Sequence, residues 1–219
     1  MKVAIDGPCG SGKGTIASLL SKKYNLVNID TGATYRCVAL ACLKNNLTLN
    51  DKEAIIKLSR KIDIRIDLDN KVYLNGEDVT DEIRSKAVTE IVSPISSIVE
   101  VRKNMVDLQR KMASNYDVVM EGRDITTVVF PDAQYKFYLD ASLEQRVARR
   151  MLQNKEKGID ISYDDVLENI KFRDYNDMHK EVGALKRTSE QVYIDSTNLS
   201  IEEVVSEFSK VIEGGKDES

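Results

Sequence analysis

The sequence predicts an α/β fold, with a parallel β-sheet at its core and a small antiparallel sheet inserted into it. Short apolar runs alternate with helical patterns along most of the chain, as buried parallel strands alternate with crossover helices. Residues 61–81 break this alternation, because apolar and charged side chains there follow a period of two, which is typical of half-exposed strands. The 219 residues, 42% of them hydrophobic, suit one large domain better than two small ones.

The apolar runs of the core place its elements in order. Residues 3–6 form a run that ends in a glycine-rich turn, and a helix is expected from Lys13, with Ile16, Leu19 and Leu20 on one face. Further strands are expected at residues 26–29, 116–120, 134–139 and 192–194, and further helices after residue 32 through 43, from 81 through 109, twice between 143 and 171, and over 201–212.

The insert carries the hairpin signals. Its first strand is predicted by the alternation of Ile62, Ile64, Ile66 and Leu68 with charged residues. A turn at Asp69-Asn70 leads to a partner strand at residues 72–74, and Asn75-Gly76 predicts a second hairpin turn. We therefore expect a small antiparallel sheet beside the core.

The two helices between residues 143 and 171 are joined by a polar turn at residues 155–158. Ser162 with Asp165 resembles a capping box at the start of the second helix. The chain end, residues 214–219, is expected to be a disordered tail.

Composition excludes several classes of protein. The net charge is −4, so the chain as a whole does not attract nucleic acid, and any bound anion needs a local cluster of cations. The longest apolar run, residues 37–43, is seven residues long, whereas a membrane-spanning helix needs about 20. Three cysteines and one histidine predict neither a disulfide framework nor the usual Cys/His metal site, so we expect a cytoplasmic protein. Because the first motif begins at Gly7, we expect no leader peptide.

The strongest chemical signal is the segment Gly7-Pro8-Cys9-Gly10-Ser11-Gly12-Lys13-Gly14-Thr15. Backbone N–H groups in such a loop can wrap a phosphate, and the helix that follows adds its dipole. Lys13 would supply a cation to the phosphates and Thr15 a hydroxyl near Mg²⁺. A glycine-rich turn with no ligand is the alternative, and the strand, loop and helix around the motif argue against it.

Arginines distinguish a phosphoryl-transfer enzyme from other proteins with such a loop. Transfer between two nucleotides gathers many phosphate charges, which need several positioned cations. Taken singly, each arginine is more often a solvated surface residue. Six of them at strand ends and around the polar turn predict a substrate clamp: Arg36, Arg123, Arg146, Arg149, Arg150 and Arg173.

The chain resembles bacterial cytidylate kinases of the long type, which belong to the P-loop nucleoside monophosphate kinases. The Gly-Lys-Gly-Thr spelling of the loop is the variant found in those kinases. The resemblance runs from Met1 to about Val211 and is carried by these segments: Ile5-Asp6-Gly7-Pro8, Asp30-Thr31-Gly32-Ala33-Thr34-Tyr35-Arg36, Leu74-Asn75-Gly76-Glu77-Asp78-Val79-Thr80 with Ile83-Arg84, Glu121-Gly122-Arg123-Asp124, Val128-Val129-Phe130-Pro131-Asp132-Ala133, Arg149-Arg150-Met151-Leu152-Gln153, Arg173-Asp174 with Asp177, and Ile194-Asp195-Ser196-Thr197.

The resemblance implies a three-layer α/β/α P-loop fold and transfer of the γ-phosphoryl group of ATP to CMP or dCMP, with Mg²⁺, by a monomer. It divides the single domain into the P-loop and start of the core (1–30), a monophosphate-binding region with the inserted hairpin (31–110), core (111–145), a helical lid with its flanking helices (146–174), the end of the core (175–213) and the tail (214–219).

The resemblance also implies roles for single residues. ATP would be bound by Gly7, Gly10, Ser11, Gly12, Lys13, Gly14, Thr15 and Arg149, with Thr15 also at Mg²⁺. The catalytic cations would be Lys13, Arg123, Arg150 and Arg173. CMP would be bound by Thr31, Tyr35, Arg36, Ser93, Arg102, Arg123, Asp124, Arg173, Asp177 and Lys180, of which Ser93, Arg102 and Asp124 would read the cytosine. No general base is needed, because the CMP phosphate is already an anionic nucleophile.

Three positions depart from the family pattern. Thr126 replaces glycine, Ala184 replaces proline and Lys180 replaces an arginine that normally contacts the monophosphate. Lysine keeps the charge but loses the bidentate fork, so we expect an active enzyme with weaker substrate binding.

Two rival functions follow from a P-loop. One is a kinase for UMP, AMP or a metabolite hydroxyl, against which the insert and Gly122-Arg123-Asp124 argue. The other is a nucleotide-dependent switch, which usually needs an Asn-Lys-x-Asp segment that the sequence lacks.

Cys9 could have a lowered thiol pKa or could be a small tolerated residue, and His179 is expected at the surface.

Overall fold

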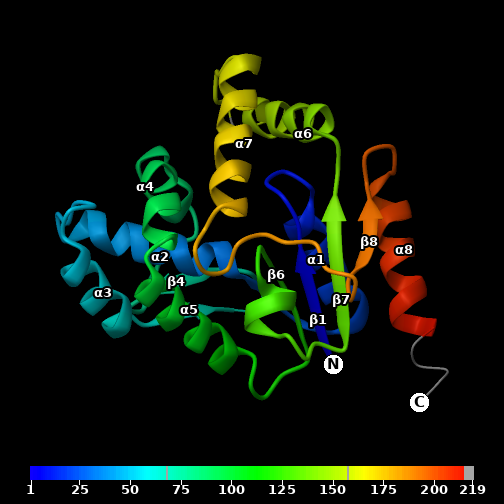
Figure 1. Ribbon diagram of the computed structural model, residues 1–219, viewed down its shortest axis with the longest axis horizontal. Helices are drawn as coiled ribbons and strands as arrows, with labels where there is room; N and C mark the ends of the chain where they lie inside the picture. The colour runs from blue at the N-terminus through cyan, green and yellow to red at the C-terminus, as the bar shows by residue number, and fades with distance from the viewer. Residues whose placement is uncertain (68, 157, 215–219) are drawn as a thin grey trace.

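A five-stranded parallel sheet forms the centre of the computed structural model, which describes residues 1–67, 69–156 and 158–214 (Figure 1). The strand order is β2-β6-β1-β7-β8, so the first strand lies in the middle. Ile5 of β1 pairs with Glu121 on one side and Phe137 on the other. The strands are β1 (Lys2–Asp6), β2 (Val27–Asp30), β6 (Val118–Gly122), β7 (Tyr135–Asp140) and β8 (Val192–Asp195), each within two residues of its prediction.

Helices cover both faces of this sheet, which confirms the three-layer α/β/α architecture. Helices α1 (Lys13–Tyr24) and α8 (Ile201–Gly214) pack on the face that receives Val3 and Ile5 of β1. Ala4 points to the opposite face, where it meets α5 (Val99–Met112) and a π-helical turn (Ile125–Val129). Alternate side chains of one central strand therefore serve two separate apolar clusters.

The helix predictions need three corrections. In α1, Ile16 and Leu20 are buried together with Ala17, but Leu19 is 36% exposed because it lies at the edge of their stripe. Helix α8 ends at Gly214, so this residue is not part of a tail, and residues 215–219 lie outside the described residues. Helix α7 (Tyr163–Met178) continues seven residues beyond its predicted end. None of the helices in the described ranges is long and apolar enough to cross a bilayer.

The insert forms a second sheet, as predicted, with strand order β3-β4-β5 and antiparallel pairing. Ile64 and Val72 are buried in it, while Asp63 and Arg65 are exposed. Leu68, predicted as part of the first strand, lies outside the described residues. The elements of this region are α2 (Thr31–Lys44), α3 (Lys52–Lys61), β3 (Ile64–Ile66), β4 (Val72–Leu74), β5 (Glu77–Asp78), a 3-10 turn (Glu82–Arg84) and α4 (Lys86–Ser96).

The insert has an apolar cluster of its own, centred on α2. Cys37 and Cys42 are buried in that cluster, as predicted, and burial raises the pKa of their thiols to about 12 and about 11. Both thiols are therefore protonated core side chains at neutral pH. In Figure 1 the insert lies beside the sheet, on the side away from α8.

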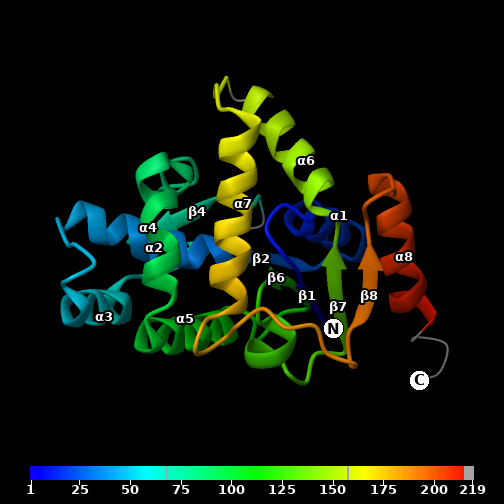
Figure 2. The same cartoon turned by 45° about the horizontal axis from the view of Figure 1, so that its top comes forward.

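Helices α6 (Leu143–Glu156) and α7 form an arm that rises beyond the carboxyl ends of the strands (Figure 2). Val147, Val166 and Ile170 form a small apolar cluster between the two helices, separate from the main core. Ser162 caps α7 by accepting a hydrogen bond from the Asp165 N–H at 3.1 Å, while its hydroxyl donates to the Asp165 carboxylate at 2.6 Å. Of the predicted turn at 155–158, Lys157 lies outside the described residues.

A buried polar network fixes the π-helical turn to the end of β1. Asp6 accepts hydrogen bonds from the N–H of Ile125 at 2.8 Å and from the N–H and hydroxyl of Thr126 at 2.9 and 2.6 Å. Gln191 donates to the Thr126 hydroxyl oxygen at 2.6 Å. Burial raises the pKa of Asp6, and the hydrogen bonds from Thr126 and Ile125 oppose that shift. The Thr126 side chain, which departs from the family pattern, is thus a partner for two buried polar groups.

We expect Thr126→Val to lower the free energy of unfolding by about 1–3 kcal/mol, because Asp6 loses a donor and Gln191 an acceptor in a buried site. The control is Thr89→Val, whose hydroxyl bonds the Ser85 carbonyl at 2.9 Å on the exposed surface of α4; its cost should stay within about 0.5 kcal/mol. Urea unfolding measures both. Equal small effects would show that the network adds no stability.

Candidate active site

A cavity of about 900 Å³ opens at the carboxyl ends of the strands, between the P-loop, α2, the insert and the α6–α7 arm. This is where ligands bind in open α/β sheets. Most of the residues predicted to form the site line it: Gly10, Ser11, Gly12, Lys13, Gly14, Thr15, Thr31, Tyr35, Arg36, Ser93, Arg102, Arg123, Asp124, Arg149, Arg150, Arg173, Asp177 and Lys180.

Two predicted members of the site have other positions. Gly7 does not line the cavity; a Cβ at this residue would lie 2.0 Å from the Leu139 carbonyl oxygen, so glycine is required for the approach of β7. Arg146 is buried away from the cavity, where it binds the Cys9 carbonyl at 2.9 Å and the Asp174 carboxylate. Arg146 therefore supports the P-loop and is not a free cation of a substrate clamp.

The P-loop surrounds the ammonium group of Lys13, which contacts two residues of the loop. Lys13 Nζ donates to the Pro8 carbonyl at 2.8 Å and lies 3.3 Å from Ser11 Oγ. Gly10 and Gly12 have φ angles of 81° and 97°, which only glycine adopts readily. Burial lowers the pKa of Lys13 to about 8; the charge of Arg123 acts in the same direction and Glu121 opposes it.

Two cations at the centre of the cavity share one carboxylate. Arg123 Nε donates to Asp177 Oδ2 at 2.7 Å, and Lys180 Nζ donates to Asp177 Oδ1 at 2.9 Å. Burial alone would raise the pKa of Asp177, but Arg123 and Lys180 hold it well below its usual range. Lys180 also donates to Ser96 Oγ at 3.1 Å. A similar pair joins Arg36 to Asp30 at 2.6 Å.

The wall formed by α5 and the end of β6 carries a buried ion pair between Arg102 and Asp124. Their side chains are 3% and 5% exposed. Arg102 Nη1 also donates to the Ser96 carbonyl at 3.1 Å, and its guanidinium lies 5.2 Å from the ring centre of Tyr35. Arg102 occupies Asp124 Oδ2, and no group within residues 1–67, 69–156 and 158–214 donates to Oδ1, so one carboxylate oxygen remains to accept from a ligand.

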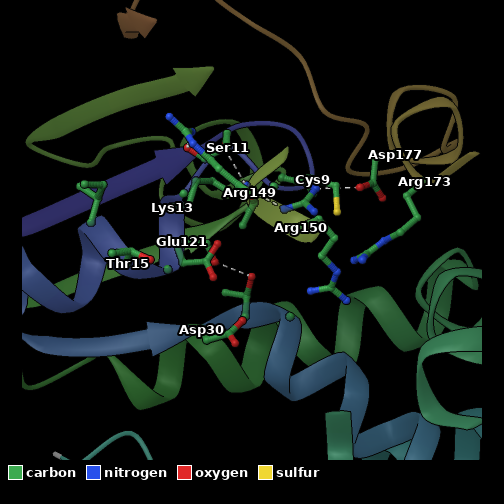
Figure 3. A pocket seen from close by; sticks show the side chains of 18 of the residues that line it. Cys9, Ser11, Lys13, Thr15, Asp30, Glu121, Arg149, Arg150, Arg173 and Asp177 are labelled. Carbon is green, nitrogen blue, oxygen red and sulfur yellow. Dashed lines mark hydrogen bonds and ion pairs between the residues drawn. The ribbon is translucent and has the colours of Figure 1, made fainter. Parts of the chain in front are cut away.

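The arm brings three further arginines to the cavity (Figure 3). Arg149 donates to the Ser11 carbonyl at 3.2 Å and to the Ser196 carbonyl at 2.7 Å, which holds it over the P-loop. The side chains of Arg150 and Arg173 extend into the space between the P-loop and α2. In the described part of the chain neither has a carboxylate partner.

Oxygen ligands suitable for Mg²⁺ lie beside the P-loop. Thr15 lines the cavity from the first turn of α1, and the carboxylates of Asp30, the last residue of β2, and Glu121, the residue before the last of β6, lie on the same side in Figure 3. Burial raises the pKa of Glu121, and the neighbouring Asp30 adds to that shift. Hydroxyl and carboxylate oxygens fit a hard cation. Among the described residues there is no cluster of three or more acidic, histidine or cysteine side chains that would hold a metal by protein ligands alone.

Three residues for which the sequence predicts no role also line the cavity: Asp30, Glu121 and Arg84. The first two stand at or next to the ends of parallel strands, and that position is itself a signal of a ligand site. Arg84 lies 3.8 Å from Asp30 and is brought there by the insert, which no local pattern indicated.

The remaining predictions concern residues near the cavity. His179 is exposed, as predicted, and stacks on Tyr175 with 4.1 Å between ring centres. Ala184 follows Gly183, whose φ of 68° is a value that only glycine adopts readily. Cys9 lines the cavity, and its backbone N–H donates to Asp174 Oδ1 at 3.1 Å.

Comparisons with known proteins agree with this geometry. The family model described as cytidylate kinase matches residues 3–214. The chain is 47% identical to a cytidylate kinase of Fusobacterium nucleatum over 211 residues, 96% of each chain, and 48% identical to one of Caldanaerobacter subterraneus, covering 94% of this chain and 91% of that one. An uncharacterized protein from Eubacterium ventriosum, 13% identical, shares the fold with a TM-score of 0.54 over 97% of this chain and 98% of that chain.

We expect affinity for ATP to fall as the pH rises past about 8, because Lys13 has a pKa of about 8 in the free protein and binds phosphate only when charged. Bound phosphates favour the charged lysine, so binding above that pH takes up a proton. Calorimetry in buffers of different ionisation enthalpy measures both effects. Lys13→Arg, which stays charged, should remove the proton uptake; unchanged uptake in this variant would contradict the assignment to Lys13.

Proposed function

The chain belongs to the cytidylate kinase family, and on that premise we propose that it transfers the γ-phosphoryl group of ATP to CMP or dCMP, giving ADP and CDP or dCDP. It is a nucleoside monophosphate kinase. One observation carries the choice of substrate: a single cavity joins the P-loop to the buried Arg102–Asp124 pair. Arg150 and Arg173, which no carboxylate of the described residues binds, line the same cavity.

The P-loop side of the cavity suits ATP. Loop N–H groups would bind the β- and γ-phosphates at the start of α1, with Lys13 as the mobile cation. Arg149, fixed on the Ser11 and Ser196 carbonyls, would lie over the nucleotide. Mg²⁺ would be held by Thr15 and, through water, by Glu121 and Asp30, and would neutralise charge on the phosphates.

The opposite side suits CMP. A monophosphate is a better ligand for Arg123 and Lys180 than the single carboxylate of Asp177, because it offers more oxygens and more charge. Once the phosphate takes over these cations, Asp177 is released toward the ribose. Arg36 would add a further contact from α2.

Base choice would rest on Asp124 and Arg102. Cytosine presents an amino donor, which the free Oδ1 of Asp124 can accept. Uracil presents an oxygen at the same position, which a carboxylate repels. Ser93 lines the same part of the cavity and would add a hydroxyl contact.

Transfer would be a direct in-line displacement without a covalent intermediate. The CMP phosphate is the nucleophile, so the protein has to position it and stabilise charge. Arg150 and Arg173 are free to contact the transferring group because no carboxylate in the described residues binds them. Closure of the α6–α7 arm would exclude water, which otherwise accepts the phosphoryl group.

We also propose a cytoplasmic monomer. All three cysteines are free, as in a reducing compartment, and residues of this chain line both the P-loop side and the Arg102–Asp124 side of the cavity.

Turnover with CMP, dCMP, UMP and AMP tests the function directly. We expect the two cytidylates to be preferred and ADP release to need an acceptor. Lys13→Ala should lower kcat by about 10²-fold or more with the fold intact, the scale of one lost charge contact. Release of ADP at full rate with no acceptor would indicate a nucleotide switch, and preference for AMP would indicate another kinase.

Replacing Asp124 tests the reading of the base. Both Asp124→Ala and Asp124→Asn remove the counter-ion of Arg102, but Asp124→Asn keeps the side-chain shape and one oxygen that accepts from the guanidinium, so it is the cleaner variant. Its amide can donate to uracil O4, and the ratio of kcat/KM for CMP over UMP should contract at least ~10-fold. The exposed Asp132→Asn is the matched control. An equal loss with both substrates would mean that Asp124 positions Arg123 and does not read the base.

Replacing Lys180 tests the departure from the family pattern. Lys180→Arg restores a bidentate fork and should lower KM for CMP, by up to the equivalent of roughly 1.5 kcal/mol, with KM for ATP unchanged. Lys186→Arg, on the exposed loop, is the control. A higher KM for CMP would show that the pocket around Asp177 and Ser96 is fitted to lysine.

A further inference from the structure

The arm binds both backbone polar groups of Cys9, which belong to the two successive peptide bonds that flank this P-loop residue. The Cys9 N–H donates to Asp174 Oδ1 at 3.1 Å, from α7, and the Cys9 carbonyl accepts from Arg146 Nη1 at 2.9 Å, from α6. Arg146 and Asp174 also form an ion pair with each other, and both are 8% exposed. The three residues thus close a ring of contacts beside the phosphate-binding loop.

The ring constrains the shape of the loop. An N–H that donates to Asp174 is not available to a phosphate, so the ring decides which loop N–H groups form the phosphate cradle. Packing adds to this constraint, because a Cβ at Gly10 would lie only 3.2 Å from Arg146 Cβ. Arg146 is itself fixed at the start of α6 by a bond from its Nε to the Ala141 carbonyl at 3.1 Å.

Helix α7 contacts the proposed CMP side of the cavity as well as the P-loop. Asp177 is four residues after Arg173 and three after Asp174, so it shares a side of the helix with each of them. Arg173 lines the cavity, Asp174 binds the P-loop, and Asp177 binds the pair Arg123 and Lys180. One rigid element therefore contacts the groups for both nucleotides.

We infer that Asp174 is a positioning residue that sets the P-loop for the nucleoside triphosphate from helix α7. This inference rests on the proposed function, in that the P-loop is taken as the ATP subsite. Asp174 touches no substrate; it acts through the Cys9 peptide and Arg146. The position of the arm and the affinity of the P-loop for phosphates are thereby coupled.

Asp174→Asn tests the inference, because it keeps the shape of the side chain. The carboxylate accepts from two donors, the Cys9 N–H and the Arg146 guanidinium. An amide has one accepting oxygen, and its NH₂ group would face one of these donors. Binding of ADP·Mg²⁺ and of CMP, each alone, is measured by calorimetry, and hydrogen exchange is followed at residues 9–12.

We expect ADP binding to weaken by about 10-fold, CMP binding to change less than about 2-fold, and exchange at residues 9–12 to accelerate. Two control variants in α7 distinguish a specific effect on the P-loop from a general loss of stability of the helix. Asp164→Asn makes the same chemical change on the exposed surface, and Val166→Ala loosens the apolar contact of α7 with α6. Neither should change ADP binding by more than about 2-fold.

Arg146→Lys is the second variant, in case Asp174→Asn does not fold. It removes the fork that reaches both Cys9 and Asp174, and should weaken ADP binding in the same way. If the three residues of the ring act as a unit, the variant that combines Asp174→Asn with Arg146→Lys should bind ADP as tightly as the more affected of the two single variants.

Wild-type affinity for ADP in both variants, or an equal loss of ADP and CMP affinity, would overturn the inference. Because binding is measured without turnover, a protein that binds ADP but does not phosphorylate CMP would refute the proposed function and leave this inference intact.

Discussion

Repulsion between cations is the constraint on which the rest of this structure depends. The cavity gathers lysines and arginines in a chain of net charge −4, and a low-dielectric site strengthens their mutual repulsion. The free protein offsets this by giving most of them an internal carboxylate. Asp177 alone serves Arg123 and Lys180, and Asp124 serves Arg102. Among the described residues, Lys13 and Arg149 bond to carbonyl and hydroxyl oxygens in place of a carboxylate. Arg150 and Arg173 also lack a carboxylate there, and the reacting phosphates would have to neutralise them.

This arrangement prepares the site for polyanions. A carboxylate that already occupies a cation orients it before the substrate arrives, so less ordering remains to be done on binding. Asp177 does so at the centre of the cavity, where its depressed pKa reflects the strength of the two contacts. Lys13 is different: within the described residues it donates to a backbone carbonyl and a hydroxyl oxygen and to no carboxylate, and burial lowers its pKa. The phosphates of a bound ligand would therefore supply the negative charge that Lys13 lacks in the free protein.

Two parts of the fold deliver these groups to one place. The parallel sheet brings the ends of β1, β2 and β6 together, and with them the P-loop, Asp30 and Glu121. Helix α7 crosses above that edge and adds Arg173, Asp174 and Asp177 from one face. The apolar pattern predicts an end for α7 at residue 171, seven residues too early. The positions beyond it that face the cavity are charged, so they show no apolar period.

The sequence by itself determined the core strands, the antiparallel insert and the P-loop, because each depends on a local pattern: apolar runs, alternation, turn residues and glycines. The sequence also predicted which lysines and arginines line the cavity, with the exception of Arg84 and Arg146, but not which carboxylates they pair with. Only the tertiary structure decided that Gly7 serves the packing of β7, that Arg146 supports the loop, and that Asp124 pairs with Arg102. Such pairings join residues far apart in the chain, and charge carries no periodicity that reveals its partner. They are decided when the sheet and the arm bring distant segments into contact.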